Sequence, residues 1–258
     1  MRRLFGVSLL LILIGLIAGC GGGSGSSNQG SNNSPTIRWL DDGTETGFLQ
    51  FYTNDADMCD KGFWYRYDKP DDTMGTVETQ VKKISGSSLY PFGIIFCFQQ
   101  TDTEIHYYRL LIYTDGSYTL GKTVTNTLTN LTNTTIIAVT NNNGASKEYI
   151  QSSLLNQGYN VTNTITVVQE ATAGNFTIYF NRDKNPNPAA TFTETSYKGG
   201  KYGFYASVGL PSEESFPNTP VDVRFRQITP TPPETSQSSA LKSQNVRNGM
   251  VWGSEKLH

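Results

Sequence analysis

Few residues of this 258-residue chain can carry covalent or acid–base chemistry, since it holds only two His, three Cys and 22 Asp and Glu. No Cys-x-x-Cys pair, Cys/His metal spacing or Gly-x-Ser-x-Gly elbow occurs, which disfavours thiol, metal and serine-hydrolase chemistry. Two close acidic pairs remain, Asp102 with Glu104 and Glu213 with Glu214. The first lies in a predicted connection and the second in a Pro-bounded loop. We expect an exposed ring for His106 and predict no catalytic residue, which favours a binding protein over an enzyme.

Charge and aromatic content narrow the class further. Charged residues make up 16% of the chain and the formal net charge is −2, which argues against a nucleic-acid-binding surface. Aromatic residues reach 12%, with 14 Tyr and 13 Phe, and Thr is abundant. Because these residue types favour half-buried strands, the composition predicts an all-β protein.

The N-terminus has the features of a secretion signal. Met1-Arg2-Arg3 is basic, and residues 4–17 form an apolar run too short to span a bilayer comfortably. The run ends in Ile17-Ala18-Gly19-Cys20, which resembles the lipobox of bacterial lipoproteins. The resemblance implies that residues 1–19 are cleaved and that Cys20 is acylated, with a fatty acid such as palmitate. Because residue 21 is Gly and not Asp, it also implies the outer membrane of a two-membrane cell envelope.

The ends of the chain are polar and lack periodicity. Residues 20–35 are rich in Gly, Ser and Asn, which predicts a flexible tether between an anchored Cys20 and a folded domain. Residues 230–258 begin with a Pro-rich stop and continue as Ser/Gln/Asn-rich sequence, which predicts a disordered tail. The folded domain is expected at residues 36–229, and its size suits a single domain.

Short alternating segments separated by turn residues fill this domain. Asp115-Gly116 between two such segments predicts a hairpin, and residues 146–155 are expected to form a turn or a short helix. A dozen short strands without a long helix predict an antiparallel sandwich or barrel. The predicted strands are 47–52, 63–67, 76–84, 92–99, 105–113, 118–122, 136–140, 163–169, 175–181, 190–195, 201–208 and 221–228.

The period of two assigns faces to these strands. Most strands are apolar on one face only, as expected for two packed sheets whose outer faces meet water. Residues 92–98 are apolar on both faces, which predicts a central strand that is covered on both sides. The pattern therefore favours a two-sheet sandwich.

Seven segments follow one another in a characteristic order: VKKISG (81–86), PFGIIFCFQQTD (91–102), HYYRLLIYTDGSYTLGK (106–122), NTITVV (163–168), FTIYFN (176–181), GGKYGFYASV (199–208) and VDVRFR (221–226). Their order resembles the concanavalin A-like lectin/glucanase superfamily. The resemblance covers residues 40–228 and implies an all-β, antiparallel two-sheet jelly-roll sandwich. It includes a tight turn at Asn181, with a longer loop after it.

What the resemblance implies for chemistry is limited. Glucanases of the superfamily place two Glu on one strand face in a Glu-x-Asp-x-x-Glu or Glu-x-Asp-x-Glu motif, and no such spacing occurs in this chain. Laminin G-like relatives often bind calcium, so a calcium site at Asp41-Asp42 or Asp55-Asp57 is possible, although no cofactor is otherwise expected.

Aromatic and basic residues outside the predicted core are the candidates for ligand binding. Sugar sites stack aromatic rings on the sugar and fix its hydroxyls with polar side chains. The alternative explanation is that Tyr and Arg simply cover outer sheet faces. The candidates are Trp64, Arg66, Tyr107, Arg109, Tyr113, Tyr205 and Arg224.

Two cysteines remain once Cys20 is assigned to the lipid. An even pair in an exported protein predicts a disulfide between Cys59 and Cys97. Cys97 also lies in an apolar run, where it can serve as a small buried hydrophobic residue.

The leading functional hypothesis is a lipid-anchored envelope protein whose sandwich binds glycans without catalysis. One alternative is a glycoside hydrolase or lyase on the same fold, which requires two carboxylates facing each other across a cleft. The other is a structural or adhesion protein of the envelope, which requires a large exposed apolar patch.

Overall fold

The computed structural model describes residues 36–40, 45–54, 62–67, 75–129, 132–137, 149–170, 174–197, 199, 201–207 and 220–229. The regular elements in this part of the chain are all β-strands. Within it, no helix is long and apolar enough to cross a membrane. The predicted signal sequence, Cys20, the tether and the C-terminal tail lie outside the described residues.

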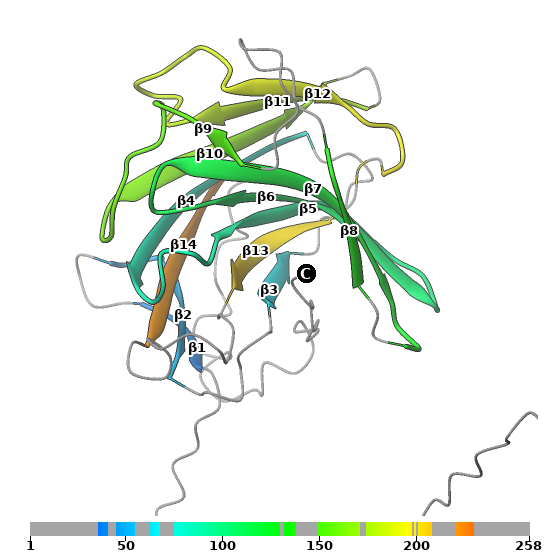
Figure 1. Ribbon diagram of the computed structural model, residues 1–258, viewed down its shortest axis with the longest axis horizontal. Helices are drawn as coiled ribbons and strands as arrows, with labels where there is room; N and C mark the ends of the chain where they lie inside the picture. The colour runs from blue at the N-terminus through cyan, green and yellow to red at the C-terminus, as the bar shows by residue number, and fades with distance from the viewer. Residues whose placement is uncertain are drawn as a thin grey trace, which may run out of the picture. The chain divides into compact units, whose positions relative to one another are not determined.

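Two antiparallel sheets contain all of these strands (Figure 1). The first, sheet A, has the order β1-β2-β14-β4-β10-β11-β12, and the second, sheet B, has the order β3-β13-β5-β6-β7-β8, with β9 also paired to β7. The strands are β1 (Thr36–Trp39), β2 (Leu49–Thr53), β3 (Gly62–Tyr67), β4 (Thr76–Ser85), β5 (Phe92–Gln100), β6 (Glu104–Ile112), β7 (Ser117–Asn126), β8 (Thr132–Ile136), β9 (Ile150–Gln151), β10 (Thr162–Gln169), β11 (Asn175–Phe180), β12 (Ala190–Thr193), β13 (Lys201–Ser207) and β14 (Val221–Thr229).

The prediction of an all-β, antiparallel two-sheet jelly-roll sandwich is therefore confirmed. Eleven of the twelve predicted strands match an observed strand closely, and the twelfth, predicted at 136–140, lies earlier as β8. The predictions missed β1, and residues 150–151 form the short strand β9 where a turn or short helix was expected.

The core lies between the two sheets, as the alternating patterns predict. Phe204 of sheet B stacks on Phe225 of sheet A, with ring centroids 4.8 Å apart. Phe96 of sheet B packs against Phe176 of sheet A at 5.8 Å. These fully buried rings join the two inner surfaces into one apolar core.

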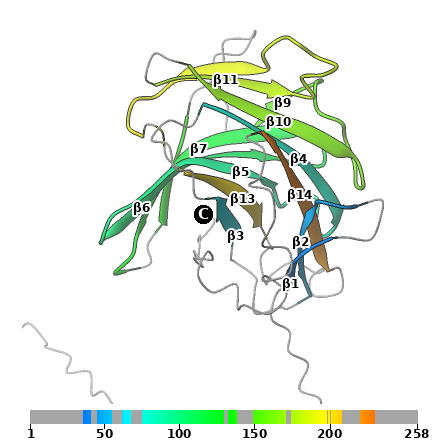
Figure 2. The same cartoon turned by 180° about the vertical axis from the view of Figure 1, so that it is seen from behind.

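Sheet B is buried on both faces at its centre. Every residue of β5 from Phe92 to Phe98 is buried, which confirms the prediction of a doubly covered central strand. On the face turned away from the core, six buried residues form a second apolar group, the inner-face cluster: Ile95, Phe98, Ile105, Tyr107, Leu111 and Tyr205. Sheet A curves around sheet B in both views, so this inner face lies on the inside of the curve (Figure 2).

Turn chemistry matches the expected turns. Gly116 has φ +82° between β6 and β7, and the Asp115 carboxylate accepts hydrogen bonds from the Ser117 amide (2.8 Å) and hydroxyl (2.6 Å). Asn181 has φ +51° at the end of β11, and its side-chain amide donates to the Leu154 carbonyl at 2.8 Å. Both turns tie neighbouring elements of the sandwich together.

The predicted disulfide is not formed in the part of the chain that the structure describes. Cys97 is a thiol on the core side of β5, fully buried within the main core, and its burial raises the pKa of the thiol to about 12. Its environment fits the alternative of a small buried hydrophobic residue. Cys59 lies outside the described residues.

Candidate functional site

The fold brings several of the predicted ligand-binding residues onto the inner face of sheet B. Tyr107 and Arg109 belong to β6 and Tyr205 to β13, with β5 between these two strands. In the register of β3 with β13, Trp64 lies opposite Tyr205 and Arg66 lies opposite Gly203. The backbone therefore gathers five of the seven predicted positions on one sheet.

Tyr107, Arg109 and Tyr205 do not form an open platform for a ligand. Tyr107 and Tyr205 are each only 3% exposed and Arg109 is 9% exposed. The ring of Tyr107 is stacked on that of Phe98, with centroids 6.2 Å apart and an angle of 16° between the planes. Because a sugar can stack only on an exposed ring face, the inner-face cluster serves primarily to stabilise sheet B.

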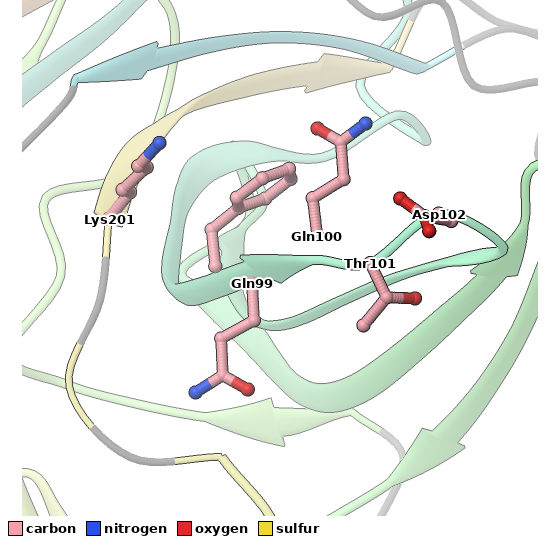
Figure 3. A pocket seen from close by; sticks show the side chains of 6 residues that line it. Gln99, Gln100, Thr101, Asp102 and Lys201 are labelled. Atoms are coloured by element: carbon pink, nitrogen blue, oxygen red, sulfur yellow. The ribbon is translucent and has the colours of Figure 1, made fainter.

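An accessible pocket opens at the end of this cluster, where the β5–β6 hairpin turns (Figure 3). Its volume is about 580 Å³, within the range of small-molecule sites. The lining residues are Phe98, Gln99, Gln100, Thr101, Asp102 and Lys201. None of these residues was among the predicted ligand-binding residues, although the polar run 99–102 directly after the apolar stretch of β5 marks the site.

The side chains around the hairpin point in opposite directions. Gln100 and Lys201 lie on one side of the hairpin, whereas Gln99 and Thr101 point to the other (Figure 3). Gln100, Thr101 and Asp102 are exposed, and Lys201 is half-buried. The pocket therefore offers amide, carboxylate and ammonium groups beside the buried aromatic ring of Phe98.

Hydrogen bonds fix the shape of the hairpin. The Thr101 amide donates to the Glu104 carbonyl at 2.8 Å, and the Glu104 amide donates to the Thr101 hydroxyl at 3.0 Å. The Thr127 hydroxyl, from the β7–β8 turn, donates to the Asp102 carbonyl at 3.1 Å. A ligand thus meets a turn whose backbone is already ordered.

The acidic pair Asp102 and Glu104 is divided between two environments. Asp102 lines the pocket, whereas the Glu104 carboxylate lies 3.3 Å from Nε2 of His106. Nδ1 of His106 is 3.3 Å from the Tyr197 hydroxyl. The prediction of an exposed ring is therefore wrong, because the His106 side chain is half-buried. Glu213 and Glu214 lie outside the described residues.

The pocket differs from a glycosidase site in the number of carboxylates among its described lining residues. Asp102 is the single carboxylate among the described residues that line it, and glycosidases require two. No group of three possible metal-ligating side chains occurs in the described ranges. The calcium candidates Asp41-Asp42 and Asp55-Asp57 lie outside those ranges.

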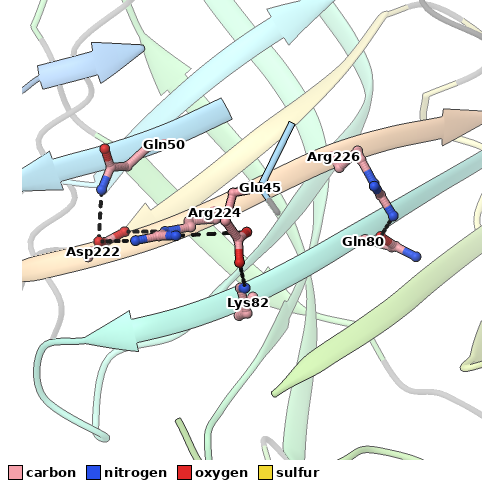
Figure 4. Close-up of polar contacts among 7 residues, drawn as sticks. All are labelled: Glu45, Gln50, Gln80, Lys82, Asp222, Arg224 and Arg226. Atoms are coloured by element: carbon pink, nitrogen blue, oxygen red, sulfur yellow. Dashed lines mark hydrogen bonds and ion pairs between the residues drawn. The ribbon is translucent and has the colours of Figure 1, made fainter. Parts of the chain in front are cut away.

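Arg224 lies far from the other candidates, on the outer face of sheet A (Figure 4). Its guanidinium donates to both carboxylate oxygens of Asp222, at 3.2 and 3.1 Å, and lies 3.8 Å from Glu45. Gln50 also donates to Asp222, at 2.8 Å, and Lys82 pairs with Glu45. Arg224 is thus a member of an ion network that crosses β2, β14 and β4.

The remaining candidate, Tyr113, follows the end of β6. Its ring meets the exposed ring of Tyr149 edge-on, with centroids 5.3 Å apart. Because β-strands rise about 3.3 Å per residue, Tyr113 lies about 20 Å along β6 from Tyr107. Tyr113 and Arg224 are therefore not part of the pocket.

Comparisons with known proteins found no matching family model and no significantly similar curated sequence. Solved structures do show similarity. One is the carbohydrate-binding module CBM66 of Bacillus subtilis, and the match covers 74% of this chain and 88% of that module, with 10% identity and a TM-score of 0.40. A Mycobacterium tuberculosis immunostimulatory antigen described as a pseudo β-1,3-glucanase covers 71% and 77%, with 13% identity and a TM-score of 0.35. At these scores, the similarity supports no statement about the function of this chain.

Proposed function

We propose that the pocket at the β5–β6 hairpin binds a carbohydrate without transforming it. The observation that carries the proposal is the set of polar groups beside the buried ring of Phe98: the Gln100 amide and the Lys201 ammonium on one side of the hairpin, and the Asp102 carboxylate at its turn. Sugar hydroxyls both donate and accept hydrogen bonds, and an amide side chain can do the same. This set of groups suits a hydroxyl-rich ligand.

The arrangement favours binding over catalysis. Hydrolysis of a glycosidic bond requires a proton donor and a second carboxylate as nucleophile or base. Asp102 can accept hydrogen bonds from two hydroxyls, and Lys201 can donate to others, but Glu104 is engaged with His106 on the other side of the strand. The hydrolase or lyase alternative therefore lacks a second acid among the described residues that line the pocket.

A glycan array probed with the purified full-length chain tests the proposal, followed by calorimetric titration with the best oligosaccharide. Gln100→Ala and Asp102→Ala remove exposed side chains of the pocket and are expected to weaken binding at least tenfold, or about 1.4 kcal/mol. Asp183→Ala and Lys184→Ala remove exposed side chains from the turn after β11 and serve as matched controls without effect. Binding that is equally strong in all four variants would contradict the assignment of the pocket.

The proposed location of the protein is the bacterial cell envelope, with the chain anchored through acylated Cys20 and held off the membrane by residues 20–35. The lipobox-like sequence Ile17-Ala18-Gly19-Cys20 supports this placement. Cys20→Ser is expected to move the protein from the membrane fraction to the soluble fraction. Unchanged partitioning would contradict lipid anchoring and would leave the binding proposal intact.

A further inference from the structure

Strand β5 contains a β-bulge centred on Cys97. This residue has φ +51°, in the left-handed region that residues other than Gly seldom adopt. Phe96 and Gln99 are three positions apart, but their partners in β6 are only two positions apart. Cys97 and Phe98 together therefore oppose the single residue Tyr107, which is the pattern of a bulge.

The pairing of β5 with β13, its neighbour on the other side, shows the same extra residue in β5. In the pairing of β13 with β5, Gly203 lies opposite Ile95 and Lys201 lies opposite Phe98. Two steps along β13 thus correspond to three steps along β5. The irregularity belongs to β5 itself, and both partner strands adapt to it.

The bulge changes which side chains reach the inner face. Phe96 and Cys97 are consecutive, yet both belong to the main core, and Phe98 then belongs to the inner-face cluster. Gln100 lies opposite Ile105, another member of that cluster. Regular alternation from Phe96 would instead return Phe98 to the core side and bring Cys97 to the inner face.

We propose that Cys97 is the positioning residue of the pocket, an inference that rests on the proposed function. By adopting the left-handed conformation, it sets Phe98 between Tyr107 and Lys201 and turns Gln100 toward the pocket. Bulges commonly re-aim side chains beside binding sites, and strained residues persist where the surrounding packing holds them. The small Cys97 side chain fits this position because it is fully buried between the sheets.

A comparison of Cys97→Gly with Cys97→Ala tests the conformation without a ligand. Gly adopts positive φ at no steric cost, whereas Ala does not. Cys97→Gly is therefore expected to unfold at the same denaturant concentration as Cys97→Ala or at a higher one, although Gly buries less side chain. The opposite order, which regular strands show, would overturn the proposal.

Cys97→Val tests positioning, because a β-branched residue strongly resists positive φ. In Cys97→Val, nuclear Overhauser contacts between the rings of Phe98 and Tyr107 are expected to be lost and glycan affinity to fall about tenfold or more. Cys97→Gly is expected to keep both. Ile94→Val is the matched control, because Ile94 is fully buried in the same strand and does not have a positive φ. It is expected to keep the ring contacts and the glycan affinity.

The outcomes separate the two proposals. If Cys97→Val and Cys97→Gly bind the oligosaccharide equally well, the positioning role is wrong and the carbohydrate site stands. If the unmodified protein binds no oligosaccharide, the proposed function fails, and the ring contacts and the Gly/Ala order still decide whether Cys97 sets the pocket face. If Cys97→Val does not fold, the Gly/Ala order is decisive.

Discussion

The outer face of sheet A and the inner face of sheet B both lie away from the shared core, and both carry an arginine that the strand pattern turns outward. On sheet A, Arg224 enters a network of carboxylates and a lysine. On sheet B, Arg109 lies between Tyr107 and Leu111 along β6, both of which belong to the inner-face cluster, and is only 9% exposed. An arginine at a strand position that faces away from the core thus belongs to an ionic surface in sheet A and lies beside a second apolar layer in sheet B.

The two faces also differ in how far water reaches their side chains. The segment from Glu45 to Phe48 lies over the outer face of sheet A, where the Phe48 ring is 5.4 Å from the Lys82 ammonium and 4.9 Å from the Arg226 guanidinium. Charges there remain partly hydrated, since the side chains of Arg224 and Glu45 are each 19% exposed. The centre of the inner face of sheet B excludes water more completely, and only its end opens as a pocket.

The largest effect on stability is expected from a substitution on the apolar inner face of sheet B. Tyr107→Ala removes a ring that is 3% exposed and stacked on Phe98, and should lower the free energy of unfolding by about 3 kcal/mol, with little dependence on salt. Urea unfolding in low and high salt measures this. A loss below about 1 kcal/mol would mean that the inner face is loosely packed and open to ligands.

A smaller effect is expected on the ionic side. Asp222→Asn leaves Arg224 with a weaker partner, and should lower the free energy of unfolding by about 2 kcal/mol at low salt because the pair is largely buried. High salt should shrink this difference, since the pair is partly exposed. The exposed Asp183→Asn is the control, and a salt-independent loss would refute an ionic role for Asp222.

Lys82 and Lys83 allow a further comparison of a buried lysine with an ion-paired one, because they are neighbours on opposite faces of β4. The Lys83 ammonium donates to the Tyr90 carbonyl at 2.8 Å and to the Ser87 carbonyl, and burial lowers its pKa to about 7. In the unfolded chain the pKa of Lys83 is near 10.5, so above pH 7 this side chain binds more protons in the unfolded protein than in the folded one. The stability of the protein relative to Lys83→Met should therefore rise with pH. The rise is about 1 kcal/mol from pH 7 to 8, measured by unfolding at each pH.

Lys82→Met is the matched control for that series. Lys82 lies on the outer face of sheet A and pairs with Glu45, so its replacement should not remove the rise in stability above pH 7. Loss of the rise in Lys82→Met, or its persistence in Lys83→Met, would show that another group titrates.

The smallest effect concerns the core that separates the two faces. The Tyr118 hydroxyl is buried without a hydrogen-bond partner among the described residues, while its ring packs edge-on against Phe180 at 5.0 Å. Tyr118→Phe keeps the ring and removes the buried polar atom, so it should raise the free energy of unfolding by up to about 1 kcal/mol. Thermal unfolding checks the sign, and a destabilised variant would indicate that the hydroxyl is bonded after all.

Strand positions and core faces were predictable because the period of two is a local property of the sequence. The alternation in Val221, Val223 and Phe225 correctly separates the core from the outer face. The same alternation also turned Tyr107 and Arg109 away from the core, and they do lie on the inner face.

The site was harder to predict because it depends on non-local geometry. The pattern around Arg224 does not reveal that Asp222 and Glu45 will surround it, nor that the inner face will bury Tyr107 and Tyr205. The bulge at Cys97 interrupts the period of two without any Gly to signal it. The face of Gln100 was therefore beyond local reasoning.

The place of β14 in sheet A has a consequence for the order of folding. This last strand lies between β2 and β4, and the hydrogen bond from Gln50 to Asp222 joins residues 172 positions apart. Until residues 221–229 are available, β1-β2 cannot join the β4-β10-β11-β12 part of the sheet. Because chain closure over such separations is slow, folding should be rate-limited by this docking step. The sandwich becomes complete only when the chain has been made as far as Thr229.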